Sequence, residues 1–386
     1  MGSTPRASAP AEQLIFLLGK RDIPADGVQD YCEYLGQALE RRGVHNEIAR
    51  VDWNSEGWLR ALRKLRNDSR AWSGDWVVLQ YTALAWSRRG FPFGAEIALS
   101  IARRRGARCA VVFHEPVGLS GPRWIDRIRA ACQNWVVRKL FNTSERNIFP
   151  DPLNTIVWLP RRDQKGVFIP IGANIPDEQE PQENSAKHDP LRKTVAIYCL
   201  SDAPNLHREL GDISAAAKIC TADGMKLRIV FFGRGTAEAN EEIKLAFETT
   251  PAEIVNLGIQ DANSVRRTLE SSDVMLCVRG LLYPRRGSAL AGIACGLPVI
   301  GYAGAAENTP ITEAGVELVP YGDRTALGAA LGRILRDSNL WQQLHEKSLQ
   351  AHRKYFSWGL IAEKFGEALF DSNTEPTGNP QVRIGG

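Results

Sequence analysis

Short apolar segments alternate with amphipathic helical patterns along most of this chain of 386 residues. In the first half the apolar segments are LIFLLG (14–19), DWVVLQY (75–81) and CAVVFHE (109–115). The run VQDYCEYLGQALERRG, which follows the first of them, repeats apolar residues at helical spacing and ends at Gly43. Strands that alternate with helices form a parallel sheet covered on both faces. The first half therefore predicts a doubly wound α/β domain.

A polar stretch, IPDEQEPQENSAKHDPLRK (175–193), interrupts this pattern with prolines, glutamates and glutamines, which is typical of an exposed linker. After it the alternation starts again. The strand candidates are TVAIYCL (194–200), KLRIVFFG (226–233), EIVNLG (253–258), DVMLCV (273–278) and LPVIGY (297–302). We predict two Rossmann-like domains that face each other across a cleft. Their predicted bounds are 11–175 and 190–355, with a flexible N-terminus (1–10) and a disordered tail (372–386).

Composition excludes several classes of protein. No stretch reaches the roughly 18 to 20 apolar residues of a membrane-spanning helix, and the start, MGSTPRASAP, has no apolar core for export, so we expect a cytoplasmic protein. The seven cysteines never form C-x-x-C, and neither H-E-x-x-H, Asp-x-Asp nor a P-loop motif occurs. We therefore expect free thiols, no metal and no resident cofactor.

Charge is distributed unevenly along the chain. Residues 1–175 carry 26 Lys and Arg against 17 Asp and Glu, a net charge of +9, whereas the remainder has 22 against 27, a net charge of −5. The first half is therefore expected to attract anions. Nucleic acid is not an expected partner, because the basic residues are scattered and no recognised binding motif accompanies them.

The run PRWIDRIRAACQNWVVRKL (122–140) mixes apolar and basic residues. Trp124, Ile125, Ile128 and Trp135 stand among four arginines and a lysine. This composition fits docking on an anionic membrane surface, and it fits equally an ordinary helix packed on its sheet through those same apolar residues.

Polar residues follow the strands of the first half where an acceptor substrate could bind. Asp26 and Gly27 end the loop that leads into the first helix, and His114 and Glu115 end the strand VVFHE. His114 could orient an acceptor hydroxyl or accommodate a developing charge. The alternatives are an ordinary glycine turn and a histidine bonded within its own loop.

The strongest local signal lies in LLYPRRGSALAGIACGLPVIGY (281–302). Here Arg285 and Arg286 precede Gly287 and Ser288 at the expected start of a helix. Ser288 could cap the helix, Gly287 admits close approach, and an arginine can bind two phosphate oxygens. The segment therefore predicts a diphosphate site, with a solvated basic loop as the alternative.

Two further features of the second half could contribute to this site. Gly233 and Arg234 belong to the turn FFGRGT at the end of a strand and could hold a base or a phosphate. Arg208, ahead of an apolar helical pattern, could add positive charge to the same phosphates.

The chain resembles the family 4 retaining glycosyltransferases, which have the GT-B fold. The resemblance rests on FIPIGANI (168–175), FFGRG, LGIQDANSVRRTLESSDVML, ACGLPVIGY and the helical segment up to KYFSW. It implies that the second domain binds a nucleotide sugar, that the first binds the acceptor, and that a helix at about 356–371, around Trp358, returns to the first domain. Arg208 then matches a phosphate-binding residue, and His114 resembles the acceptor-domain histidine.

The chain departs from this family at one important place. Members commonly carry two glutamates, eight positions apart, just before the A-C-G-x-P-V segment, where this chain has Tyr283 and Ala291. Recognition of the sugar and the ribose would then pass to other groups, with Glu307 as the candidate carboxylate.

The resulting expectation is a hexosyltransferase that uses a nucleoside-diphosphate sugar and a glycan or lipid-linked acceptor, in bacterial-type synthesis of cell-surface polysaccharide or glycoconjugates. His114, Arg208 and Arg286 are the expected catalytic residues. The alternatives are a GT-B protein that binds a nucleotide or glycan without catalysis, and a sugar-nucleotide epimerase.

Overall fold

The chain divides into two compact units. The computed structural model describes residues 13–19, 27–118, 121–160, 165–177, 192–304 and 309–370. The first unit comprises 1–170 and 361–386, and the second comprises 171–360. By comparison, the sequence analysis places the end of the first domain at 175 and the return of the chain at about 356. The predicted site residues Asp26 and Glu307, the N-terminus 1–10 and the tail 372–386 lie outside the described residues.

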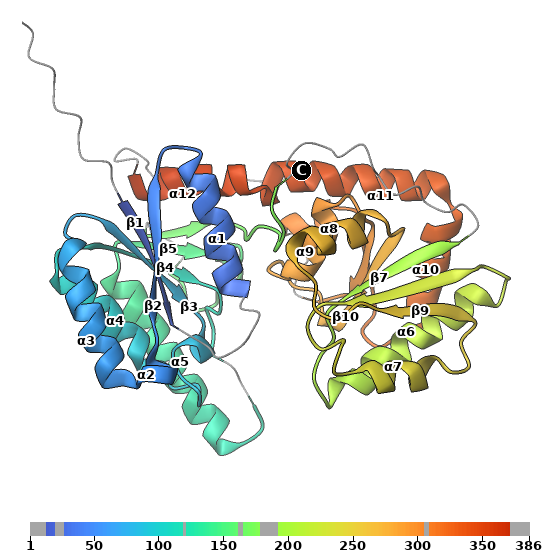
Figure 1. Cartoon of the computed structure of the whole chain (residues 1–386), viewed down its shortest axis with the longest axis horizontal. Coiled ribbons are helices and arrows are strands. Elements are labelled where there is room, and N and C mark those ends of the chain that lie inside the picture. Colours follow the sequence, from blue (N-terminus) through green and yellow to red (C-terminus); the bar gives the residue numbers. More distant parts are fainter. Residues whose placement is uncertain are drawn as a thin grey trace, which may run out of the picture. The chain divides into compact units, whose positions relative to one another are not determined.

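The first unit contains a six-stranded parallel sheet with the order β2-β1-β3-β4-β5-β6 (Figure 1). Its strands are β1 (Gln13–Gly19), β2 (His45–Val51), β3 (Trp76–Tyr81), β4 (Arg108–Phe113), β5 (Arg146–Phe149) and β6 (Gly166–Phe168). Its helices are α1 (Gly27–Glu40), α2 (Trp53–Glu56), α3 (Trp58–Asp68), α4 (Phe93–Arg104) and α5 (Trp124–Thr143), with short 3-10 turns η1 (Ser69–Ala71), η2 (Ala83–Ala85) and η3 (Leu153–Thr155). All six residues of β3 are buried, which explains why the strand reads as a continuous apolar run.

The second unit contains a second six-stranded parallel sheet, in the order β12-β11-β10-β7-β8-β9. Its strands are β7 (Lys193–Tyr198), β8 (Leu227–Phe232), β9 (Ala252–Asn256), β10 (Val274–Leu281), β11 (Val299–Tyr302) and β12 (Val316–Val319). Its helices are α6 (Asn205–Thr221), α7 (Asn240–Phe247), α8 (Ala262–Glu270), α9 (Gly287–Ala294), α10 (Arg324–Arg336) and α11 (Ser338–Ala351), with the short helical turns η4 (Pro310–Glu313) and η5 (His352–Phe356). The predicted α/β class with doubly wound sheets is confirmed.

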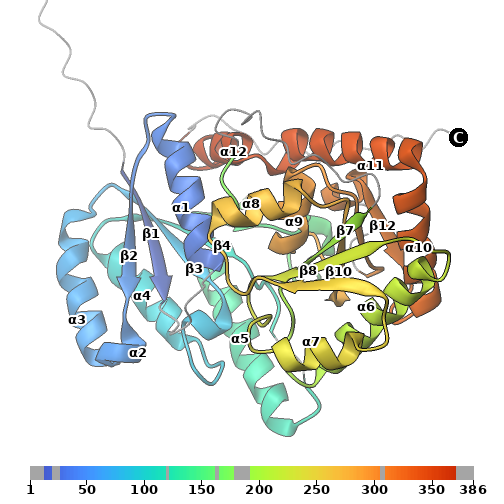
Figure 2. The same ribbon diagram turned by 45° about the vertical axis from the view of Figure 1, so that its right-hand side comes forward.

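Alternate residues of the second sheet enter two separate cores. Val195 and Ile197 of β7 pack with α6, α7 and α10, whereas Ala196 between them packs with α8 and α9. Figure 2 shows α8 and α9 on the opposite side of this sheet from α6 and α7. The middle of β7 is therefore buried on both faces, as is typical of a parallel sheet covered by helices.

The last helix, α12 (Trp358–Phe370), is shared between the two units. The indole N–H of Trp358 donates to the carbonyl oxygens of Ala173 (3.1 Å) and Ile175 (3.0 Å), all within the second unit. A Cβ at Gly172 would lie 2.6 Å from the Trp358 ring, so only glycine permits this packing. Trp358 itself therefore holds the start of the second unit, and the helix is counted with the first unit only from Ile361 onward.

Candidate functional site

The strand order of the second sheet reverses between β7 and β10. From β7 the chain builds β8 and β9 on one side, and it later builds β10, β11 and β12 on the other. Ligands of open α/β sheets bind beyond the carboxyl ends of the strands at such a reversal. In this unit those ends are Cys199, which follows β7, and Arg279, near the end of β10.

The backbone is strained at Cys199. This residue has a φ of 68°, in the left-handed region that side chains with a Cβ rarely adopt. Gly233, which directly follows β8, is buried and has a φ of 88°, and a Cβ there would lie 2.8 Å from the Cys199 sulfur. Gly233, predicted to bind the donor, is thus required for the close packing of the β7 and β8 ends.

The charges of three arginines at this end of the sheet act on the Cys199 thiol: Arg234 after β8, Arg279 near the end of β10 and Arg286 before α9, here called the arginine cluster. Burial raises the pKa of the Cys199 thiol, and the three guanidinium charges partly offset this rise. Among the described residues, no carboxylate forms an ion pair with any arginine of the cluster. Three positive charges therefore meet at this sheet edge without a described counter-charge.

Arg279 is the member of the cluster that the sequence analysis missed. Its Nε atom is buried and has no hydrogen-bond partner among the described residues. The pairing of β10 with β11 shifts register between Cys277 and Leu281, and Gly280 within this irregularity has a φ of 71°. Bulges of this kind redirect side chains near functional sites. The available signal was an arginine at the carboxyl end of an apolar strand, VMLCVR.

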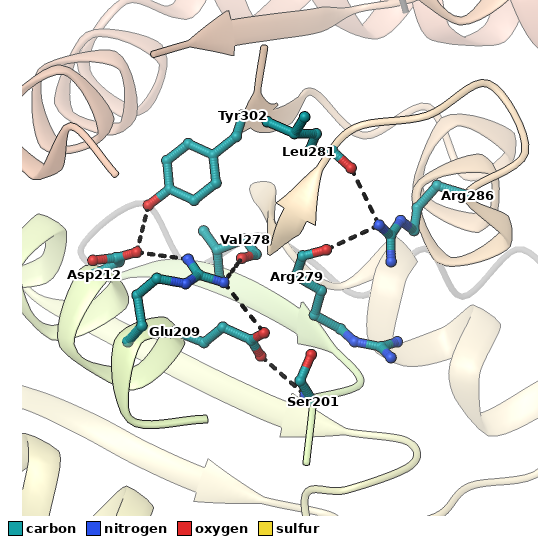
Figure 3. Close-up of polar contacts among 9 residues, drawn as sticks. Ser201, Glu209, Asp212, Val278, Arg279, Leu281, Arg286 and Tyr302 are labelled. Atoms are coloured by element: carbon teal, nitrogen blue, oxygen red, sulfur yellow. Dashed lines mark hydrogen bonds and ion pairs between the residues drawn. The ribbon is translucent and has the colours of Figure 1, made fainter. Parts of the chain in front are cut away.

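Arg286 closes the turn after β10. Its Nη2 atom donates to the carbonyl oxygens of Arg279 (2.9 Å) and Leu281 (3.1 Å), as Figure 3 shows. Arg286 is also the N-cap residue of α9, and its side chain makes no capping hydrogen bond. The first amides of α9 thus start beside the arginine cluster.

The expected capping role of Ser288 is wrong. Helix α9 begins at Gly287 with Arg286 as its N-cap residue, so Ser288 lies inside the first turn and does not cap the helix. A Cβ at Gly287 would lie 3.1 Å from the Asn174 side chain, so this glycine allows Asn174 to approach the helix start.

The two adjacent arginines of the predicted turn differ in their surroundings. The Arg285 guanidinium lies 5.7 Å from the centre of the Tyr283 ring, a cation–π contact. Arg286 instead belongs to the arginine cluster. From the sequence both arginines are assigned to the phosphate site, and of the two only Arg286 is predicted to be catalytic.

Arg208 is already occupied by internal partners. It lies in the first turn of α6, not ahead of it, and its Nη1 atom donates to Asp212 (3.0 Å). Its Nη2 atom contacts Glu209 (3.4 Å) and the carbonyl oxygen of Val278 (3.1 Å) (Figure 3). Both carboxylates are buried, and the Tyr302 hydroxyl donates to Asp212 at 2.7 Å. Unlike the arginine cluster, Arg208 has its charge balanced within the protein.

The candidate residues of the first unit lie at the ends of neighbouring strands. The His114 Nε2 atom lies 2.8 Å from Gln80 Oε1, and its ring meets Tyr31 edge-on at 5.2 Å. The Glu115 carboxylate accepts the backbone N–H of Ala83 at 2.9 Å. Half-buried His114 is therefore held in a fixed orientation at this sheet edge.

Gly27, predicted with Asp26 to contact the acceptor, is the first residue of α1 and is exposed. Its position at the start of a helix, just after the strand β1, agrees with the expected strand-to-helix loop.

The positions of the absent glutamates offer no substitute. Ala291 is fully buried within α9, in the core between that helix and the sheet, and the Tyr283 ring faces Arg285. Within the described ranges, no three His, Cys, Asp or Glu side chains gather as metal ligands would. None of the described helices is long and apolar enough to span a bilayer.

Comparisons with known proteins identify the fold. No protein-family model matches the chain, and no curated protein matches its sequence. Among solved structures, sucrose-phosphate synthase from Thermosynechococcus elongatus is similar with a TM-score of 0.68 at 17% identity, over 92% of this chain and 98% of that one. Anabaena HepE, in complex with UDP and glucose, gives a TM-score of 0.63 at 14% identity, over 93% and 99%.

A third similar structure is a putative UDP-N-acetylglucosamine 2-epimerase from Listeria monocytogenes, with a TM-score of 0.61 at 13% identity, over 92% of this chain and 95% of that one. The match of both parallel sheets over nearly the whole chain shows that this protein has the GT-B fold. Since transferases and an epimerase share this fold, the reaction must be argued from the site.

Proposed function

We propose that this protein is a glycosyltransferase that moves a hexose from a nucleoside-diphosphate sugar to a glycan or lipid-linked acceptor, with retention of configuration. One observation carries the proposal: three arginines without a described counter-charge meet at the strand reversal of the second sheet, beside the start of α9. This arrangement suits a diphosphate, which carries two negative charges or more. Retention follows from the resemblance to the family 4 enzymes.

The chemistry asked of this site is stabilisation of a leaving group. As the bond between sugar and diphosphate breaks, negative charge grows on the departing phosphate oxygen. Arg279 and Arg286, with the amides of Gly287 and Ser288, would neutralise that charge. A well-placed donor of this kind is worth about 3 to 4 kcal/mol in catalysis. Arg234, exposed on the neighbouring turn, would add charge at the edge of the site.

Arg208 has a different part in this proposal. Because its guanidinium bonds to the Val278 carbonyl and to two carboxylates, it fixes the end of β10 from which Arg279 projects. We therefore assign it as a positioning residue, in place of the direct phosphate contact expected from the sequence.

The acceptor would be bound by the first unit, where His114 is oriented by Gln80. In this proposal His114 orients the acceptor hydroxyl. The reaction would take place in the cytoplasm at the inner face of a membrane, in synthesis of cell-surface polysaccharide or glycoconjugate, without a metal ion.

The test combines binding with turnover. Nucleotide sugars are screened for a rise in melting temperature, and those that bind are assayed for nucleoside-diphosphate release with and without lipid-linked acceptors. We expect the Arg279→Gln variant to lose both the melting shift and the release, whereas Arg353→Gln, an exposed arginine of the same unit, keeps both. Binding without release by the unmodified protein would overturn the transferase and favour a nucleotide-binding partner protein.

Epimerisation of a sugar nucleotide is the second candidate, because a putative epimerase shares the fold. It requires no acceptor and releases a changed sugar nucleotide. Proton NMR of a donor incubated with the protein alone separates the two reactions, since a new epimer at equilibrium would replace the transferase proposal.

A further inference from the structure

Helix α5 turns a mixed apolar and basic face to solvent. Trp124, Ile128 and Trp135 are 72%, 45% and 54% exposed. Together with exposed Ala131 and Arg138 they follow one another at steps of four and three residues, which places them along one side of the helix. These tryptophans therefore do not attach α5 to its sheet.

Other residues attach α5 to the first unit. Val136, Val137, Leu140 and Phe141 are buried, with the first three at 1% exposure or less. They join the core formed with β3, β4 and α4. Packing through Trp124, Ile128 and Trp135, which the sequence left open as an alternative, is thus wrong, although Ile125 is half-buried.

The neighbouring helix α4 extends this apolar face. Phe93 and Ile97 are each 43% exposed, and the Phe93 ring lies 5.9 Å from that of Trp135. Residues Phe93, Ile97, Trp124, Ile128 and Trp135 are here called the α4–α5 surface. All ten tryptophans of the chain lie within the described ranges, and the two on this surface are the ones that are exposed.

The surface is bordered by positive charge. Arg123, Arg127, Arg138 and Lys139 are exposed. The sole acidic residue of α5, Asp126, is engaged by Arg129 and by the backbone N–H of Arg123. Figures 1 and 2 show the first part of α5 extending past the other helices of this unit, so its side chains can reach a flat partner.

We propose that the α4–α5 surface docks on an anionic lipid bilayer. Tryptophan prefers the boundary between lipid headgroups and acyl chains, and arginines beside it can meet lipid phosphates while their stems cover apolar surface. Each basic residue near an anionic leaflet strengthens binding, and the four exposed ones here have no acidic residue of α5 left to oppose them. The charge selects lipid over a second copy of this chain, whose own surface would bring like charges together.

Co-sedimentation of the full chain with vesicles tests this docking and needs no enzymatic activity. Vesicles of phosphatidylcholine alone are compared with vesicles that also contain phosphatidylglycerol. We expect binding only to the second kind, decreasing with added salt. Trp124→Ser with Trp135→Ser should abolish binding, and Arg127→Glu with Arg138→Glu should weaken it by about tenfold or more.

Matched controls come from helix α3 of the same unit. Leu59→Ser removes an apolar side chain that is 76% exposed, and Arg63→Glu with Lys64→Glu reverses two exposed charges. Both controls should bind vesicles like the unmodified protein. Equal binding by control and α5 variants would overturn the proposal. So would a dimer in light scattering that the tryptophan variant converts to monomer, because the surface would then join two copies.

Discussion

In both units the candidate site residues lie at the carboxyl ends of parallel strands, but the two sheets carry different side chains there. The edge of the first sheet holds one histidine, bound to an amide and an aromatic ring. The edge of the second sheet holds three arginines whose charges act on one thiol. Yet the first 175 residues have a net charge of +9 and the rest a net charge of −5. The net charge of a region therefore does not coincide with the proposed diphosphate site.

Ion pairing explains why the region with the negative net charge still has an unbalanced positive cluster. In the second unit the acidic residues are used elsewhere: Glu209 and Asp212 balance Arg208, and Glu253 pairs with Arg192. The arginine cluster keeps its charge unbalanced among the described residues. In the first unit part of the surplus positive charge lies on α5.

The largest expected effect is the loss of nucleotide affinity when the arginine cluster of the second sheet loses two of its charges. Arg279→Ala with Arg286→Ala should weaken binding of a nucleoside diphosphate, with UDP as the probe, about a hundredfold, or about 2.7 kcal/mol. Isothermal titration calorimetry measures this, with Arg353→Ala as the control in the same unit. A change of less than threefold in the double variant would remove the diphosphate from this edge.

The single variants of this pair should differ in stability. Arg286 donates two hydrogen bonds to backbone carbonyls, so Arg286→Ala should lower the free energy of unfolding by about 1 kcal/mol. Arg279→Ala breaks no described hydrogen bond of its side chain and should leave stability nearly unchanged. Urea unfolding of the two variants separates the contributions. We also expect Arg286→Ala alone to lower turnover at least tenfold.

A smaller effect is expected at the first edge. His114→Ala should reduce kcat about tenfold, or about 1.4 kcal/mol, while UDP affinity stays the same, because the histidine is proposed to act on the acceptor. His45→Ala, at an exposed histidine of β2, serves as the control. Loss of UDP affinity in the His114 variant would show that the two edges do not divide the substrates as proposed.

The irregularity in β10 gives a finer comparison. Gly280 and Gly322 both have positive φ, at 71° and 77°, and no atom lies within 4 Å of a Cβ built on either. Alanine at each should cost about 1 to 2 kcal/mol of stability. Gly280→Ala alone should also weaken UDP binding several-fold, because it disturbs the strand end that carries Arg279. Equal UDP binding by both variants would contradict this.

The smallest effect concerns the thiol at the second edge. Since burial raises its pKa, Cys199 stays protonated at neutral pH, and its alkylation by iodoacetamide should be slower than that of an unstructured cysteine. The rate should rise with pH beyond the ordinary thiol range. Arg279→Gln removes the charge that most favours the thiolate and should slow alkylation a few-fold further. Peptide mapping by mass spectrometry follows Cys199 alone, and a faster rate in the variant would refute the assigned proximity.

The fold was predictable because its central strands are buried on both faces. β3 and β10 read as apolar runs, and the spacing between them leaves room for covering helices. The arrangement of the site residues was harder to predict from the sequence. Arg279 reads as the end of an apolar strand, and neither the shifted register nor the φ of Gly280 is visible in a sequence. Those two features belong to the backbone, not to residue type.

Some of the contacts that the sequence analysis missed could have been predicted from the spacing of nearby residues. Asp212 stands four residues after Arg208, a spacing at which opposite charges pair on a helix. The internal ion pair of Arg208 could therefore have been predicted from the sequence. The exposure of Trp124 could not have been predicted in this way, because a helical pattern shows which residues share a face but not which face packs on the sheet.

The hydrogen bonds from Trp358 to Ala173 and Ile175 close the second unit at its two chain ends. The second unit begins at residue 171 and ends at residue 360, and this one indole joins its first residues to its last. In the order of the chain it is an insertion whose two ends meet. Cutting the chain at these two points would divide α12 but no strand of either sheet, so we expect the second unit to be exchangeable as a whole.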